Sequence, residues 1–276
     1  MMDFDFSLPG DFGLNPPKKH LQLPGGASGV LLHCCCAPCS VAVLECLLAS
    51  GIRPLLYFYN PNISPQDEYQ KRRDEWLHLA ALLGLESLCG DYDLREWQEC
   101  TRGLEREPER GARCDVCFKM RLKAAALETR AHGLKLFATT LASSRWKDRA
   151  QVDRAGFAAA AQVPGTVYWD QDWRKGGIIT RRHELIREIG FYNQQYCGCV
   201  FSLAEARKRH KKVPAGRRAA AGSPPPGTGN PAPVCAAGSS QGSTAACTRD
   251  RAPKCTSLPQ SGPEAPRGGR ELQDTP

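Results

Sequence analysis

The chain has 276 residues, of which 41% are hydrophobic, and its formal net charge of +8 fits a polyanionic partner or an ordinary solvated basic surface. No apolar run approaches the roughly 18 residues of a membrane span, and no charged start leads into an apolar signal segment. We therefore expect a cytoplasmic protein without membrane association, in which 14 cysteines are more typical of metal or redox sites than of a disulfide framework.

Composition divides the chain into three segments. Residues 1–29 are rich in Pro and Gly, which predicts a flexible N-terminal segment. Residues 212–276 resemble them: from Gly216 onwards Phe, Trp, Tyr, Ile and Met are absent, and Gly and Pro make up 19 of 61 residues. Such a segment buries too little apolar surface to offset the entropy lost on ordering, so we expect a disordered tail. The folded domain is expected at 30–211.

Strands and helices are predicted to alternate along this domain. The first expected strand, VLLH, leads into the cysteine-rich loop HCCCAPCS, and the apolar run PLLYFYN is typical of a strand covered on both faces. The helix after it is expected to begin with Ser64 as its cap and Pro65 at its first position, and to end at Gly84. The expected strands are 30–33, 54–60, 85–90, 135–141 and 166–170, and the expected helices are 40–50, 64–84, 94–105, 117–133, 146–161 and 181–190.

This alternation predicts an α/β fold in which a parallel sheet has helices on both faces. In such sheets, ligands bind in the crevice outside the carboxyl ends of the strands. The cysteine-rich loop and residues 60–62, 139–140 and 169–170 all follow predicted strands. We therefore expect these four segments to face one crevice.

Cysteine occurs in three closely spaced clusters, CCCAPC, CDVC and CGC. Cys36/Cys39 and Cys114/Cys117 have the CxxC spacing, and two such pairs can form a tetrahedral zinc site or hold an iron–sulfur cluster. We favour this interpretation over a group of small apolar core side chains. Cys117 is expected to open a helix, where the amide dipoles would favour a thiolate.

The CGC cluster predicts different chemistry. Only one residue separates Cys197 from Cys199, and a disulfide across so short a loop would be strained and easily reduced. Such a pair suits a two-electron relay. A third metal-binding pair and unreactive thiols are the alternatives.

Several motifs occur together in the order typical of one family. HCCCAPCS, YFYNPNI, EYQKR, RCDVCFKMRL, FATTL, RKGG and FYNQQYCGCVFSL resemble the QueH-type epoxyqueuosine reductases over about 30–203. The resemblance implies the last step of queuosine biosynthesis, in which the epoxide oxygen of epoxyqueuosine is removed at the wobble base of tRNA. It also implies an α/β fold related to the adenine-nucleotide-hydrolase-like (HUP-like) domains.

The resemblance further implies a 4Fe–4S cluster and a redox-active disulfide. The implied cluster ligands are Cys35, Cys36, Cys114 and Cys117, with Cys34 as an extra thiol beside them. Cys39 stands where a ligand to an additional mononuclear iron would come. The CGC pair, Cys197 and Cys199, matches the redox-active disulfide of the family, which an electron donor that the sequence does not identify would have to reduce.

Basic residues near aromatic ones are the candidates for tRNA phosphate contacts. The segments SSRWKDR and WRKGG combine Arg and Lys with Trp, which fits phosphate binding and base stacking or a solvated basic surface. The candidates are Arg72, Arg121, Lys147 and Lys175. Tyr59 and Tyr196 are candidate proton donors for the reduction.

Two other functions fit the same cysteine pattern. An iron–sulfur-dependent tRNA thiolation-like enzyme would need ATP and an S-G-G-x-D-S-type loop after the first strand, where this chain has HCCCAPCS instead. A zinc-stapled RNA-binding module would be colourless, whereas an iron–sulfur protein is brown. Neither a Walker-A sequence nor a G-x-G-x-x-G motif after a strand occurs.

Overall fold

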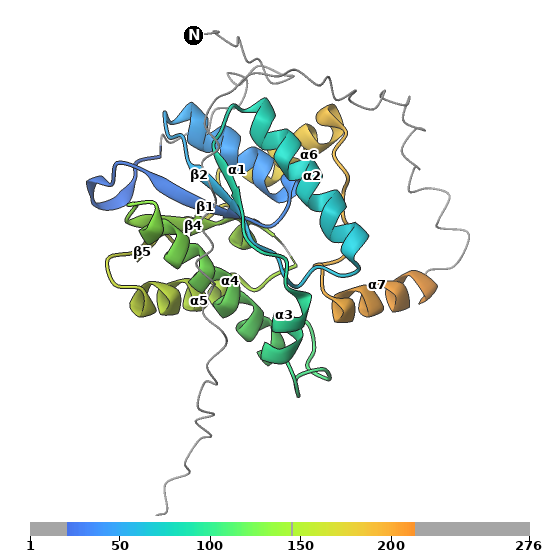
Figure 1. Ribbon diagram of the computed structural model, residues 1–276. Coiled ribbons are helices and arrows are strands. Elements are labelled where there is room, and N and C mark those ends of the chain that lie inside the picture. Colours follow the sequence, from blue (N-terminus) through green and yellow to red (C-terminus); the bar gives the residue numbers. More distant parts are fainter. Residues whose placement is uncertain (1–20, 145, 213–276) are drawn as a thin grey trace, which may run out of the picture. The chain divides into compact units, whose positions relative to one another are not determined.

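The computed structural model describes residues 21–144 and 146–212. Their centre is a five-stranded, fully parallel sheet with the order β3-β2-β1-β4-β5 (Figure 1). The strands are β1 Val30–Cys34, β2 Leu55–Phe58, β3 Ser87–Cys89, β4 Leu136–Thr139 and β5 Val167–Tyr168. Because the chain adds strands first on one side of β1 and then on the other, the switch point lies between β1 and β4.

Helices cover both faces of the sheet, which confirms the predicted fold class. Figure 1 shows α1, α2 and α6 on one side and α4 and α5 on the other. The packing of α1 against α6 and of α4 against α5 joins the helices within each layer. The helices are η1 Pro24–Gly26, α1 Ala37–Ala49, α2 Gln66–Leu82, α3 Leu94–Cys100, α4 Ala112–Ala131, η2 Thr140–Ser143, α5 Arg149–Gln162, α6 Ile178–Ile189 and α7 Val200–Lys212.

Strand β1 is buried along its whole length, as expected for a central strand covered by helices on both faces. It pairs with β2 on one side and with β4 on the other. The largest buried side chains around it include Trp76, Phe58 and Phe137. This core fixes the carboxyl ends of β1 and β4, which position the cysteine-rich loop.

Five predicted helix starts are wrong, and two of these are the starts of α5, at Arg149 rather than residue 146, and of α6, at Ile178 rather than residue 181. Helix α1 begins at Ala37 rather than at residue 40, because Pro38 fits the first turn of a helix, and Cys39 therefore lies inside the helix. Helix α2 begins at Gln66 after Pro65, so Ser64 is not its cap. Helix α4 begins at Ala112, which puts Cys117 in its second turn.

The ends of the predicted domain differ in what the structure describes. Residues 21–29 precede β1, and Leu21, Leu23 and Ala27 pack against the core, although the sequence predicts a flexible segment there. Residues 1–20 and the predicted tail beyond Lys212 lie outside the described residues. Within the part of the chain that is described, no helix has the length and apolar character needed to cross a membrane.

Candidate active site

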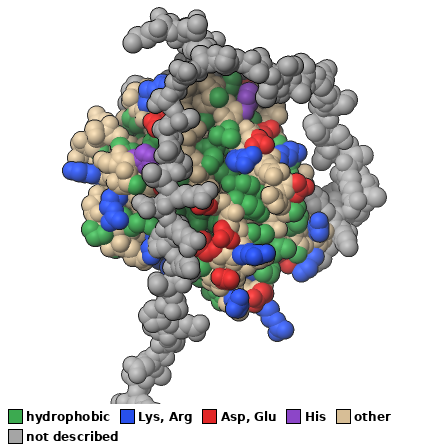
Figure 2. Space-filling model, in the orientation of Figure 1, with side chains coloured by type: hydrophobic (Ala, Val, Ile, Leu, Met, Phe, Trp, Pro, Cys, Tyr) green, Lys and Arg blue, Asp and Glu red, His purple; other side chains and the backbone are tan. Residues whose placement is uncertain are grey.

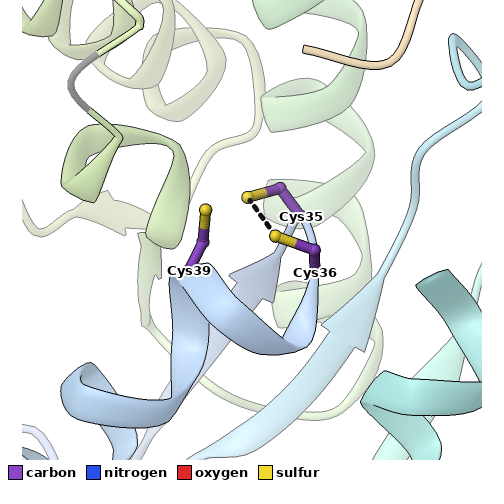
Figure 3. A group of neighbouring side chains, drawn as sticks. All are labelled: Cys35, Cys36 and Cys39. Atoms are coloured by element: carbon purple, nitrogen blue, oxygen red, sulfur yellow. Dashed lines mark hydrogen bonds between the residues drawn. The ribbon is translucent and has the colours of Figure 1, made fainter. Parts of the chain in front are cut away.

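Three buried thiols meet at the carboxyl end of β1. Cys35 and Cys36 follow the strand and Cys39 lies in the first turn of α1, with all three sulfurs pointing toward one another (Figure 3). The Sγ atoms lie within 4.8 Å of one another, and those of Cys35 and Cys36 are 3.8 Å apart. Metal–thiolate bonds are about 2.3 Å long, so one ion could contact all three sulfurs.

Cys35 is the thiol of this trio that is most easily ionised. Hydrogen bonds from Cys36 and Cys39 lower the pKa of Cys35 well below its usual range, and the charges of Lys147 and Arg121 act in the same direction. Burial raises the pKa of Cys36, while the hydrogen bond with Cys35 raises the pKa of Cys39 to about 11. The site therefore stabilises one thiolate beside two buried cations.

Residues from the ends of β4 and from the segment before α7 hold the trio in place. The backbone N–H of Cys35 donates to Thr140 Oγ1 over 3.1 Å, and the Thr140 hydroxyl lies 3.6 Å from Cys35 Sγ. Gln194 Nε2 donates to Cys36 Sγ over 2.7 Å. Sequence reasoning assigned no role to Thr140 or Gln194, although both lie in the motifs FATTL and FYNQQYCGCVFSL.

A second group of thiols contains both other cysteine motifs. Burial raises the pKa of Cys114 to about 12 and also raises that of Cys117, and in both cases nearby Cys197 and Cys199 add to the increase. Cys117 and Cys199 pack together with Trp97 in a small apolar cluster. The structure thus brings the CxxC pair of α4 next to the CGC segment.

The two thiol groups interact with the same cations. Among the described residues, the cluster of three potential metal ligands contains Cys35, Cys36 and Cys39, without Cys114 or Cys117. Arg121 nevertheless interacts electrostatically with both Cys35 and Cys117. Lys147 does so with Cys35, Cys39 and Cys197.

Both cysteines of CGC are free thiols in this structure. Cys197 is partly exposed, whereas Cys199 is buried and lies 3.5 Å from Ser202 Oγ. Gly198 between them has a φ of +140°, and a Cβ placed there would lie 3.0 Å from side-chain atoms of Asn62 and Ile63. This position therefore requires glycine.

Arg72 fixes the same segment from α2. Its guanidinium donates to the carbonyl oxygens of Cys197 and Tyr196 over 3.1 and 3.2 Å, and it forms an ion pair with Glu68 at 2.6 Å. Both the backbone of the CGC segment and a buried carboxylate thus depend on one cation.

A cavity of about 900 Å³ opens in front of the first thiol group. This volume lies at the upper end of the range for small-molecule sites. Among the described residues, the lining contains no Asp or Glu, in contrast to the face in Figure 2, where Lys and Arg are interspersed with Asp and Glu. It includes Cys35, Cys36, Cys39, Arg72, Trp146, Lys147, Arg182, His183, Arg187, Tyr192, Gln194, Tyr196, Cys197 and Arg209.

The four candidate tRNA-contacting residues occupy different environments. Arg72 and Lys147 are buried and line the cavity. Arg121 is buried and donates to Tyr59 O and Asn60 Oδ1. Lys175 is 85% exposed, forms a 3.8 Å ion pair with Asp172 and does not line the cavity. The four therefore do not form one surface.

The candidate proton donors also differ in position. Tyr196 lines the cavity, and its hydroxyl donates to Ser64 O over 2.8 Å. Burial raises the pKa of Tyr196 and of Tyr59, so both are protonated at neutral pH. Tyr59 is not among the residues that line the cavity.

The chain is similar to known proteins over nearly all of its described part. The family model described as "Epoxyqueuosine reductase QueH" matches residues 30–205. A protein of that name from Haemophilus influenzae is 45% identical over 191 residues, which are 69% of this chain and 78% of the relative. The corresponding protein from Acinetobacter baylyi is 44% identical over 71% of this chain and 89% of its own length. The one from Thermotoga maritima is 33% identical over 67% of this chain and 95% of its own length.

Proposed function

The chain belongs to the epoxyqueuosine reductase QueH family of oxidoreductases, and from this premise we propose that it reduces epoxyqueuosine to queuosine at the wobble base of tRNA. This is the last step of queuosine biosynthesis. The catalytic domain of this proposal is 30–211, and its place of action is the cytoplasm, where tRNA is modified.

The observation that best supports the proposal is the thiol trio in front of the cavity. Cys35, Cys36 and Cys39 combine soft ligand atoms, burial and adjacent cations with a space large enough for a modified nucleoside. Thiolates are typical ligands of iron–sulfur centres. A cation-lined cavity without acidic residues also suits a polynucleotide substrate better than a neutral metabolite.

The thiol chemistry fits an iron–sulfur centre, with Cys35, Cys36, Cys114 and Cys117 as the proposed 4Fe–4S ligands. The shared electrostatic influence of Arg121 on Cys35 and Cys117 supports this set, because both motifs then face one buried cation. Cys39, within 4.8 Å of Cys35 and Cys36, is the proposed protein ligand of an additional mononuclear iron. Such a centre supplies electrons one at a time and a Lewis acid for the epoxide oxygen.

The remaining chemistry is assigned to the protein's own residues. Conversion of the epoxide to the alkene breaks two C–O bonds and consumes two electrons and two protons, with water as the second product. Oxidation of Cys197 and Cys199 from two thiols to one disulfide releases two electrons and two protons, so the equation balances. An external electron donor must then reduce this disulfide. Tyr196 is the proposed proton donor at the cavity wall, because its phenol is protonated there.

The test is a turnover experiment with a nucleoside readout. Protein reconstituted with iron and sulfide is incubated with epoxyqueuosine-containing tRNA and a reductant. The tRNA is then digested, and the masses of its nucleosides are measured by mass spectrometry. We expect the mass of the modified nucleoside to fall by that of one oxygen atom, without ATP hydrolysis. Cys114→Ser should abolish turnover, whereas Cys89→Ser, an exposed thiol on β3, should leave it unchanged.

Other results would favour the alternative functions. Turnover that requires ATP and adds sulfur would favour a thiolation-like enzyme. A colourless protein with one zinc ion per chain and no turnover would favour an RNA-binding module. If the fully reconstituted brown protein left the mass of epoxyqueuosine in the tRNA unchanged, the reductase proposal would be contradicted.

A further inference from the structure

The cations at the cavity come from two different depths. Arg72 and Lys147 lie deep and are almost fully buried. Arg187 on α6 and Arg209 on α7 are exposed, and Arg182 on α6 is partly exposed. Arg209 forms a 3.7 Å ion pair with Glu109, whereas Arg182 and Arg187 have no acidic partner among the described residues, so these two give the outer wall of the cavity its positive charge.

Helix α6 is oriented so that part of its cationic side meets the cavity. The Arg181 guanidinium donates to both carboxylate oxygens of Glu45 on α1. Leu185 of the same helix is fully buried. Arg182 and Arg187 line the cavity from this anchored helix. Arg182 Nε is shielded from solvent and lacks a hydrogen-bond partner within the described part of the chain.

An aromatic side chain lies beside these cations. Trp146 lines the cavity and is 47% exposed, which is unusual for the largest apolar side chain. The guanidinium of Arg209 lies 5.4 Å from the centre of its ring. Arg209 thereby connects the indole to α7, and the pair combines a stacking surface with a positive charge.

We propose that Trp146, Arg182, Arg187 and Arg209 form the docking surface for the anticodon loop of the substrate tRNA. The arginines contact the phosphates that flank the target nucleotide, and Trp146 stacks on a neighbouring base. This inference rests on the proposed function, since a wobble base can enter the cavity only when the loop around it is held outside. Phosphate contacts and base–aromatic stacking are the two interactions with which proteins bind single-stranded RNA.

The test measures binding of the holoprotein to an unmodified anticodon stem–loop RNA as a function of salt. Removal of two phosphate contacts from a single-stranded loop should flatten the slope of log K against log salt by about 1.4. We expect this change in the double variant Arg182→Gln/Arg187→Gln. Trp146→Ala should weaken binding roughly tenfold with an unchanged slope, and Trp146→Phe should retain most of the affinity.

Arg207→Gln is the matched control. Arg207 is exposed on α7 and does not line the cavity, so its loss removes one positive charge from outside the cavity, compared with two in the double variant. We expect the salt slope of this variant to equal that of the wild-type protein. Thermal unfolding of every variant establishes that the fold is intact, and Arg182→Lys/Arg187→Lys, which keeps the charge, should restore the slope.

The proposal is overturned if the control and the cavity variants flatten the slope of log K against log salt equally, or if neither flattens it. Both results would mean that RNA attaches elsewhere or through net charge alone. The readout uses RNA without an epoxide, so it does not depend on turnover. Failure of the reductase function would appear as an unchanged nucleoside mass with wild-type protein, while a wrong docking surface would appear in the binding slopes.

Discussion

Single residues in this protein connect the thiol site to the rest of the fold, and Arg72 does so most directly. It is buried, it is paired with Glu68, and it donates to two carbonyl groups of the segment that contains Cys197. Its predicted role was a phosphate contact. The structure gives it at least a second role, because its hydrogen bonds determine where the partly exposed Cys197 lies beside the cavity.

Arg72→Met should therefore destabilise the protein and release the CGC segment. Loss of the guanidinium leaves the largely buried Glu68 carboxylate without its cation, although the Tyr192 hydroxyl still donates to it, so the cost should lie at or below the roughly 3–5 kcal/mol of a broken buried ion pair. The free energy of unfolding in urea should fall by about that amount, and Cys197 should react faster with a thiol reagent.

The matched change is Arg73→Met, which removes the next residue along α2. Its ion pair with Asp74 is exposed, so its loss should cost less than about 1 kcal/mol. Equal stability losses in the two variants would contradict the buried role of Arg72.

At the scale of elements, α6 is the wall of the cavity, and one ion pair anchors it. Arg181 lies 2.8 Å from Glu45 of α1, and both side chains are largely buried. The adjoining side chains on α6 line the cavity. The wall is thus fixed to the sheet through α1, which also contains Cys39 in its first turn.

Arg181→Met should loosen this wall without unfolding the sheet. Glu45 would then lie buried without its cation, so α6 should separate transiently from α1. Hydrogen–deuterium exchange should accelerate in α6 and stay unchanged in β1 and β4. Arg187→Met, on the exposed part of the same helix, is the control, and equal acceleration by both changes would refute the anchoring role.

The order of strands and α-helices could be predicted from the sequence as far as α6, because apolar runs and helix stops are local signals, whereas α7 was not predicted. The start of α4 could not, since the backbone N–H of Ala112 is capped by the Glu107 carboxylate from five residues upstream. The grouping of the thiols was equally hard to predict. Cys36 and Cys39 meet because α1 starts early enough to bring residues three apart onto one side, and spacing alone does not reveal which CxxC pairs approach each other.

At the scale of the whole molecule, the described part contains one main hydrophobic cluster. Among the described residues, its side chains lie between Leu21 and Phe191. A second, smaller cluster contains Trp97, Cys117 and Cys199, with Phe201 of α7 packed against it. The last described element, α7, ends at Lys212.

A chain of residues 21–212 should consequently fold and reduce the substrate like the full protein. Its thermal midpoint is expected within about 3 °C of that of the full chain, because every core side chain among the described residues is kept. A chain that ends at residue 191 should be less stable and inactive, since it lacks Cys197, Cys199 and Phe201. A large loss of stability in the 21–212 chain would show that the omitted segments contribute to the fold.

The close packing around Gly198 also limits how this protein can diverge. A methyl group there would meet Asn62 and Ile63 from one loop and come within 3.4 Å of Arg72 from α2. In evolution, Gly198 could therefore be replaced only if several neighbouring residues moved or changed at the same time, which a single nucleotide change does not achieve. The packing around Gly198 therefore restricts the residue between Cys197 and Cys199 to glycine, whatever redox reaction the two cysteines perform.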